Sequence, residues 1–299
     1  DVSWSRGLGD VYKRQTHLAH VAMSRWFSRY RGRALSVANL GYSLGESFLP
    51  MFFVAILVWL PWRSVWLFSA IFPLFVAVAT YCALKDERSP KSFKEDKVSF
   101  GIGGRHWSRS QVLKSSIFWF AFPGLLGLPA FGTVLFFQQV NYAALKGWDH
   151  LSMVKAYPLF TIMAVGVSFL SGSLIDRHGA TKLIGFYQIP AVFGFYVFSI
   201  CETVMGFSIG LILFAVTAGS NNIIPNAFWA ECFGTSHLGR IKSLAAGIMV
   251  IGSALGPLIS GVLIDVGFNL NSQYILFATY FILSSALLFA CTRKILVNN

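Results

Sequence analysis

The sequence contains little charge for its length. Only 12% of its 299 residues are Asp, Glu, Lys or Arg, whereas a soluble domain carries about 25%. Apolar residues make up 55% of the chain, and the few charges are bunched, so that long windows contain almost none. Helices of a soluble protein would be shorter and would carry a polar stripe. The composition therefore predicts helices that cross a membrane.

Eight windows are long enough to cross the hydrocarbon core of a bilayer, which takes about 20 apolar residues in a helix. They cover residues 34–60, 62–84, 113–137, 154–175, 183–201, 203–230, 243–268 and 273–292. Helices satisfy their own backbone hydrogen bonds in lipid. We therefore expect an all-α polytopic membrane protein whose main partner is the lipid bilayer.

Cysteine and other metal-binding residues are scarce. The four cysteines, Cys82, Cys201, Cys232 and Cys291, lie far apart in or beside apolar windows. Their spacing is typical of neither a zinc site nor a disulfide framework, and no His, Asp or Cys cluster indicates a membrane enzyme. We predict no metal, no cofactor and no catalytic residue, and we expect these cysteines to face lipid or the protein core.

The sequence also lacks a nucleotide-binding loop. Gly101-Ile-Gly103-Gly104 is rich in glycine, but it has no lysine–serine ending and no strand before it. We interpret it as part of a flexible linker, and we expect Ser110–Ser116 to be an interfacial lead-in to the next span. Any transport would then be driven by a gradient.

Aromatic residues, in contrast, are abundant. The chain has 29 Phe and 9 Trp. Such residues commonly face lipid or form belts at the membrane interfaces, and we expect both positions here.

The formal net charge of +12 would suit a nucleic-acid-binding protein, but the basic residues are concentrated in alternate loops. The richer set of loops contains Arg25–Arg33, Lys85–Lys114, Arg177 and Lys182, Arg240 and Lys242, and Arg293 and Lys294. The opposite set contains only Arg63, Lys146 and Lys155. This bias marks the cytoplasmic side. We predict a multi-pass protein of a bacterial inner membrane with a cytoplasmic C-terminus and no nucleic-acid partner.

The first fifteen residues differ in character from the rest. Ser5–Gln15 resembles the in-frame translation of a transposon-end sequencing adapter. The segment 1–15 is polar and has no apolar core, so it is not a signal peptide. We interpret residues 1–15 as non-native, with a genuine basic N-terminal tail as the alternative.

An internal repeat relates two glycine-containing spans. Arg31–Gly45 aligns without gaps onto Lys242–Gly256, an offset of 211 residues. In both copies basic residues precede glycines that are one helical turn apart, and such glycines allow helices to approach closely. The repeat predicts two related halves of six helices each.

The repeat also divides the chain into segments. Residues 16–84 would be the remainder of an N-terminal half, namely the end of helix 4 with helices 5 and 6. Residues 85–112 would be a cytoplasmic linker, and residues 113–299 a C-terminal half with helices 7–12. On this scheme the first half lacks about three helices and most of a fourth.

One loop carries a specific motif. The sequence Gly172-Ser-Leu-Ile-Asp176-Arg177-His-Gly179-Ala-Thr-Lys182 resembles the cytoplasmic signature of the major facilitator superfamily. It lies where the repeat places the loop between helices 8 and 9. Its small residues suit a tight turn, and Asp176 is suited to accept hydrogen bonds from backbone N–H groups at a neighbouring helix start.

Three other segments resemble the same superfamily. Arg25–Ala34 is similar to the junction of helices 4 and 5 in the branch that includes monocarboxylate and oxalate/formate exchangers, and Trp62-Arg63 resembles the start of helix 6 there. Trp229–Gly234, followed by His237–Arg240, is similar to the junction of helices 10 and 11 in bacterial permeases.

The resemblance implies a gate made of charged residues. Asp176, Glu231 and Arg240 would form a cytoplasmic cluster that closes one face and breaks during alternating access. The alternative for Glu231 and Arg240 is a solvated pair in a loop, which contributes under about 1 kcal/mol.

The sequence departs from the carboxylate-carrying branch at one point. Those carriers hold the carboxylate with a basic residue at mid-membrane in helix 8 or 11. Here helix 8 has only Lys155 near its outer end, and Leu244–Ile264 of helix 11 has no charge. An anionic solute would need its counter-charge from other helices.

Polar residues inside the spans are candidates for a solute pathway. Glu46 lies about fifteen residues into helix 5, where a carboxylate is costly unless it is paired or faces a cavity. It shares a helix face with Asn39 and Ser43. It is either a proton-coupling or solute-polarising site, its pKa raised by burial, or a structural hydrogen-bonding group.

Amides, hydroxyls and one histidine complete the pathway candidates. They are Gln138, Gln139 and Asn141 at the end of helix 7, Thr217, Ser220, Asn221 and Asn222 in helix 10, and His20 in the remnant of helix 4. Polar groups at such depths are expensive unless they line water or a ligand.

The sequence thus predicts a monomeric secondary active transporter, one that moves a small organic solute, with or without a coupled proton, by alternating access between two six-helix halves. Three alternatives stay open: an exchanger specific for monocarboxylates or other organic anions, a transporter-fold membrane sensor, and a non-functional fragment.

Overall fold

The computed structural model describes residues 41, 44–45, 48–84, 101–104, 106–221, 223–234 and 237–297. The chain forms two compact units, Asp1–Asp96 and Lys97–Asn299. The border between them falls inside the segment 85–112. Unit 1 contains a short apolar helix, Phe48–Leu57, and the 23-residue helix α3, Trp62–Leu84, with Pro73 inside it.

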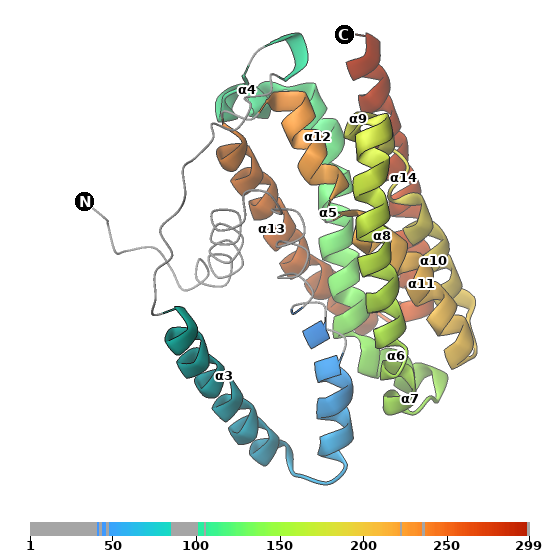
Figure 1. Cartoon of the computed structure of the whole chain (residues 1–299). Coiled ribbons are helices and arrows are strands. Elements are labelled where there is room, and N and C mark those ends of the chain that lie inside the picture. The colour runs from blue at the N-terminus through green and yellow to red at the C-terminus, as the bar shows by residue number, and fades with distance from the viewer. Residues whose placement is uncertain are drawn as a thin grey trace. The chain divides into compact units, whose positions relative to one another are not determined.

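Unit 2 is built from helices (Figure 1). A 3-10 turn, η1 (Ile102–Gly104), leads to α4 (Arg109–Lys114), α5 (Ser116–Phe137), α6 (Gln139–Lys146), α7 (His150–Val154), α8 (Tyr157–His178), α9 (Ala180–Leu183), α10 (Ile189–Ile200), α11 (Val204–Asn221), α12 (Ile224–Phe233), α13 (Leu238–Asp265) and α14 (Leu270–Val297). The described part of the chain has no strand, which confirms the all-α fold.

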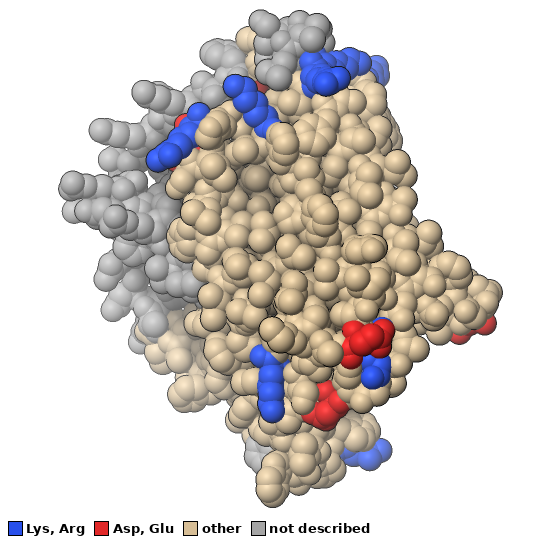
Figure 2. Space-filling model, turned by 90° about the vertical axis from the view of Figure 1, so that its right-hand side faces the viewer, with Lys and Arg blue, Asp and Glu red and all other residues tan. Residues whose placement is uncertain are grey.

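Six helical segments in the described residues are long and apolar enough to cross a membrane. They are Trp62–Cys82, Ser116–Phe137, His150–His178, Val204–Phe233, Gly239–Asp265 and Leu270–Ile295. Figure 2 shows a broad band without charged side chains between an upper edge rich in Lys and Arg and a lower edge of mixed charge. The predicted polytopic membrane protein is confirmed.

Two predicted spans are interrupted rather than continuous. The span 183–201 begins at the last residue of α9 and then consists of a turn at 184–188 and the 12-residue helix α10. The span 203–230 is divided between α11 and α12. Pro190 and Pro225 stand at the first turns of α10 and α12. Because proline lacks an N–H and clashes with the preceding turn, it begins a helix more readily than it continues one.

Two helix crossings in unit 2 are closest at a glycine. α5 packs against α13, and α8 packs against α11. A Cβ on Gly256 would lie 2.3 Å from the Ala130 carbonyl oxygen, and one on Gly219 would lie 2.2 Å from that of Ala164. The absence of a Cβ is what lets these backbones touch. The close approach predicted for the second copy of the repeat is confirmed at Gly256.

These crossings are part of a symmetric arrangement. α10 packs against α11, α14 packs against α5, and α10 and α14 pack against each other. The list of packed pairs stays the same when each helix is replaced by its counterpart in the other set of three. The counterparts are α5 and α11, α8 and α13, and α10 and α14. That is the relation expected of two inverted three-helix repeats inside one six-helix half.

The centre of unit 2 is aromatic, which corrects the expectation that phenylalanine serves mainly as lipid-facing bulk. Phe195 on α10 is fully buried, with its ring 5.5 Å from that of Phe214, 5.6 Å from that of Phe277 and 5.6 Å from that of Phe281. Edge-on pairs, as with Phe214 and Phe277, and stacked pairs, as with Phe281, fill space between helices and attract each other beyond their area of contact. Several phenylalanines therefore hold helices together.

The end of the linker is packed, which corrects its interpretation as flexible. A Cβ on Gly101 would lie 2.6 Å from backbone atoms of Cys232, Phe233 and Gly234. Gly103 and Gly104, with φ of 72° and 64°, make the 3-10 turn in a conformation that favours glycine. These glycines serve close packing and a tight turn.

Candidate functional site

The signature motif forms the junction of two helices. Gly172, Asp176 and Arg177 belong to the last two turns of α8, and Gly179 follows with a φ of 79°. That conformation favours glycine because a Cβ would be strained there. α8 ends at this residue and α9 begins directly after it, at Ala180. The predicted tight turn is therefore found at Gly179.

A carboxylate from another helix closes this junction. Glu231, near the end of α12, accepts hydrogen bonds from the backbone N–H of Ala180 at 2.7 Å and of Thr181 at 2.9 Å. The Thr181 hydroxyl also donates to it, at 2.8 Å. The first N–H groups of a helix have no partner inside the helix, and here a charged acceptor from α12 supplies one. We call Glu231 with Ala180 and Thr181 the clasp.

The clasp corrects one expectation. We predicted that Asp176 would accept from backbone N–H groups, whereas in the described residues that acceptor is Glu231. Asp176 is exposed on the last turn of α8. Asp176 comes before the turn, inside α8, where the backbone N–H groups are already bonded within the helix.

The remaining charges of the predicted gate are exposed. Arg177, Lys182 and Arg240 all lie on the surface of unit 2. Within the part of the chain that the structure describes, no ion pair joins Asp176, Glu231 and Arg240. Their joint action as a gate stays a prediction, while Glu231 has a defined partner in α9.

The amides at the end of helix 7 lie at a bend between α5 and α6. Gln138 is buried and accepts a 2.6 Å hydrogen bond from the Asn141 side chain, which is itself exposed. Gln139 accepts from the Tyr157 hydroxyl of α8. All three predicted pathway residues thus make hydrogen bonds within or between helices, and Asn141 is also exposed.

The polar residues of helix 10 lie at the interruption between α11 and α12. Ser220 accepts from the Ser171 hydroxyl of α8 at 3.2 Å. Thr217 is fully buried, and its hydroxyl has no hydrogen-bond partner among the described residues. Asn221 is half-buried at the last residue of α11.

Several candidates lie outside the described residues. They are His20, Asn39, Ser43, Glu46 and Asn222. The described residues contain no group of His, Cys, Asp or Glu that would hold a metal ion.

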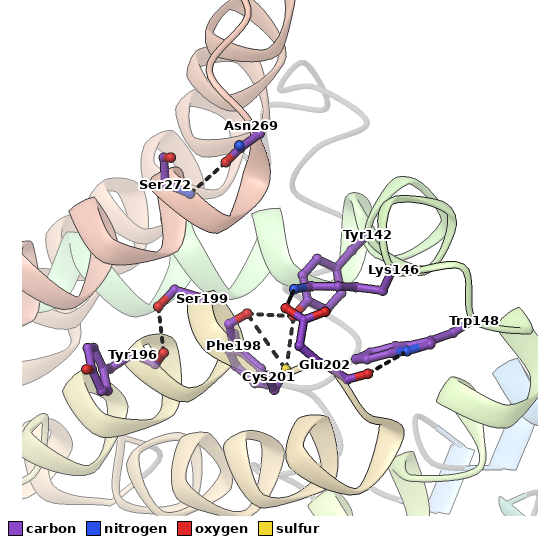
Figure 3. Close-up of polar contacts among 10 residues, drawn as sticks. All are labelled: Tyr142, Lys146, Trp148, Tyr196, Phe198, Ser199, Cys201, Glu202, Asn269 and Ser272. Atoms are coloured by element: carbon purple, nitrogen blue, oxygen red, sulfur yellow. Dashed lines mark hydrogen bonds and ion pairs between the residues drawn. The ribbon is translucent and has the colours of Figure 1, made fainter.

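The opposite end of unit 2 has a polar cluster that sequence reasoning missed (Figure 3). The Tyr142 hydroxyl of α6 donates to the Phe198 carbonyl at 2.6 Å and lies 3.1 Å from Cys201 Sγ. Burial raises the pKa of Tyr142 far above its usual value, so the phenol stays a donor. Lys146 pairs with Glu202 at 2.8 Å, and the Trp148 indole donates to the Glu202 carbonyl at 3.3 Å.

A signal for part of this cluster was present in the sequence. Lys146 and Glu202 are charges of opposite sign that flank spans on the same predicted side. The bond of Tyr142, however, is to a backbone carbonyl, and no residue pattern marks such an acceptor.

The fold and these sites agree with a comparison against protein families. Residues 16–257 match the family model described as Major Facilitator Superfamily. The chain belongs to the Major Facilitator Superfamily. Its members are transporters and not enzymes, which confirms the expectation of a membrane transport protein.

A curated protein is similar over part of the chain. The Agnestins efflux protein AgnL12 of Paecilomyces divaricatus is 30% identical over 141 residues, which are 47% of this chain and 31% of that protein. The chain thus covers about a third of the length of this relative. The clasp and the signature loop of this superfamily member lie at one end of unit 2, and the Tyr142 cluster lies at the other.

Proposed function

We propose that this Major Facilitator Superfamily chain works in secondary active transport of a small organic solute, by alternating access between two helical halves. The observation that carries the proposal is the match to a transporter family over residues 16–257, in a chain whose described helices are long and apolar. The relative named as an efflux protein favours an organic molecule as the solute and export as the direction.

The interior of unit 2 favours a solute without a strong negative charge. Across α5, α10 and α11 no residue is charged, and on α8, α12, α13 and α14 the charged residues lie at the ends. A carboxylate inside a membrane needs a fixed cation nearby. The exchanger of monocarboxylates is therefore the weaker proposal, since its cation would have to come from outside these helices.

The charge of the two ends supports an orientation for unit 2. Around the α9 end the bases greatly outnumber the acids, Asp176 and Glu231; the bases are Arg109, Lys114, Arg177, Lys182, Arg240, Lys242, Arg293 and Lys294. The α6 end has a more even mixture. By the positive-inside bias we propose that the α9 end and the C-terminus face the cytoplasm.

Glu46 is the proposed proton-coupling residue, on sequence grounds alone. In the proposed mechanism its carboxyl group binds a proton on one side of the membrane and releases it on the other. Glu46→Gln removes the titratable proton and keeps the shape of the side chain, so it is expected to abolish proton-driven accumulation of the solute and to leave expression unchanged.

The test is transport by the purified chain in liposomes. Counterflow with a panel of labelled neutral, cationic and anionic organic solutes identifies the cargo, and an imposed pH gradient with and without a protonophore identifies coupling. Glu202→Gln, the same change at an exposed residue of the α6 end, is the control for Glu46→Gln. Counterflow no faster than in empty liposomes contradicts transport, and unchanged proton-driven uptake by Glu46→Gln contradicts the coupling role.

A second preparation addresses the fragment alternative. A longer protein with further N-terminal helices is assayed beside the 299-residue chain. Equal counterflow by both supports a functional chain, whereas counterflow only by the longer protein identifies the chain as an inactive part of it.

A further inference from the structure

The described residues Gly101–Gly104 and His106–Ser108, which together we call the strap, lie against the end of α12. The backbone N–H of Trp107 donates to the Phe233 carbonyl at 3.1 Å. Inside the strap the Trp107 indole donates to the Ile102 carbonyl at 3.2 Å. The segment therefore closes on itself and on the last turn of α12.

The fit between the strap and α12 is close. Gly101 lies against the backbone of Cys232, Phe233 and Gly234, so that any side chain there would overlap it. The ring of Trp107 meets that of Phe233 edge-on at 5.5 Å. Phe233 is fully buried and stacks on Trp229 at 5.7 Å. Apolar burial and a backbone hydrogen bond hold the strap in place.

The residues under the strap directly follow the acidic residue of the clasp. Glu231 is adjacent to Cys232, and its carboxylate reaches across to Ala180 and Thr181 of α9. A helix end that frays moves its terminal side chains first. Whatever fixes Cys232–Gly234 therefore also fixes the position from which Glu231 reaches α9.

We propose that the strap is a positioning segment for the clasp: the final residues of the linker hold the end of α12 so that Glu231 stays bonded to the start of α9. The strap and the signature loop then form one mechanical unit. A displacement of the strap is passed to the end of α12 and opens the clasp. This inference needs no assumption about the solute.

The test is hydrogen exchange of the Ala180 and Thr181 amides, the two donors to Glu231, in the whole chain. Gly101→Ala places a Cβ 2.6 Å from three backbone atoms and is expected to speed exchange at both amides about tenfold, close to the effect of Glu231→Gln. Residue 101 contacts neither amide, so a purely local defect would leave them unchanged. Gly239→Ala is the control, because a Cβ there meets nothing within 4 Å.

A second pair of measurements excludes general loosening and tests the coupling. The Ser152 amide, which donates to Asp149 at 2.9 Å at the other end of unit 2, should exchange at its original rate in Gly101→Ala. If exchange of the Ser152 amide also becomes faster in Gly101→Ala, Trp107→Leu is used in place of Gly101→Ala, and exchange of the same three amides is compared. In a protein that already carries Glu231→Gln, adding Gly101→Ala should speed exchange of the Ala180 and Thr181 amides by less than a further twofold. Unchanged Ala180 and Thr181 exchange in the variant, or fully multiplicative effects in the double variant, would overturn the proposal.

Discussion

The two ends of unit 2 are held together by different chemistry. At the α9 end a carboxylate on the surface, Glu231, accepts from backbone N–H groups of another helix. At the α6 end the main contact is a fully buried phenol, Tyr142, whose hydroxyl donates to the Phe198 carbonyl. Aromatic rings pack at both ends, but the helix contact compared here is made by a charge near water at the first end and by a buried aromatic side chain at the second.

This difference indicates which end opens more easily. A contact made by an exposed charge is exchanged for water at little cost, whereas a buried aromatic side chain loses its packing and leaves a cavity when it is removed. We therefore expect the α9 end to open more easily and the α6 end to stay packed. The contacts at the two ends should differ accordingly in what they contribute to the free energy of unfolding.

The largest effect is expected from Tyr142→Ala at the α6 end. The Tyr142 ring meets those of Trp148, Phe207 and Tyr274 at 5.7, 5.9 and 5.2 Å. Loss of such a buried ring costs about 3–5 kcal/mol. Tyr142→Phe keeps the ring and loses only the hydrogen bond, for about 1 kcal/mol. Denaturant titration in detergent micelles measures both, and equal losses for the two variants would show that packing is not what holds this end.

The next effect concerns the middle of unit 2, which both ends share. Gly256→Val forces α13 away from the Ala130 backbone of α5, and such overpacking costs about 3 kcal/mol. Gly261→Val on the same helix is the matched control, because a Cβ there meets nothing within 4 Å. Hydrogen exchange should rise at both ends in Gly256→Val. A rise at one end alone would mean that only that end depends on this crossing.

A smaller effect is expected from Glu231→Ala at the α9 end. It leaves the Ala180 and Thr181 N–H groups without their charged acceptor, and water replaces it in part because Glu231 is exposed. A loss of about 1–2 kcal/mol is expected. Glu231→Gln should lie between the wild type and Glu231→Ala, since one carbonyl oxygen remains. Thermal unfolding in detergent ranks the wild type, Glu231→Gln and Glu231→Ala by stability. If Glu231→Ala lost as much stability as Tyr142→Ala, the proposed difference between the two ends would be wrong.

Most of the fold was predictable from the sequence, because hydrophobic length alone indicates a membrane span. The same reasoning failed where a short-range feature decides the structure. Pro190 shortens one span to the 12-residue helix α10, and Gly101 turns an expected flexible linker into a packed strap. Proline and glycine were visible in the sequence, but the neighbour that each one meets was not.

The site was predictable in its residues more than in its contacts. The motif indicated a tight turn, which is found at Gly179. Glu231 was expected in a charged gate with Asp176 and Arg240; that gate stays a prediction, and the contact that Glu231 makes is with the start of α9. The acceptor was assigned to Asp176 because it lies in the motif, whereas the actual acceptor comes from a residue 51 positions away from Ala180. The resemblance indicates which residues belong to the site. Which N–H group each carboxylate contacts is decided by the packing of α12 against α9, and the sequence does not show that packing.

The smallest effect is expected from the ion pair of the α6 end. Glu202 is an exposed carboxylate like Glu231 but lies at the opposite end, so the two residues show whether the charge or its position matters. Glu202 is 78% exposed in its side chain, although Lys146 is nearly covered. An ion pair with one partner in water contributes about 0–1 kcal/mol and weakens with salt. Glu202→Gln should therefore destabilise less than Glu231→Gln, and its small loss should vanish at about 1 M salt. If Glu202→Gln proved the more costly of the two, surface charge would matter more at the end that we expect to stay packed, and the assignment of the mobile end to α9 would have to be reversed.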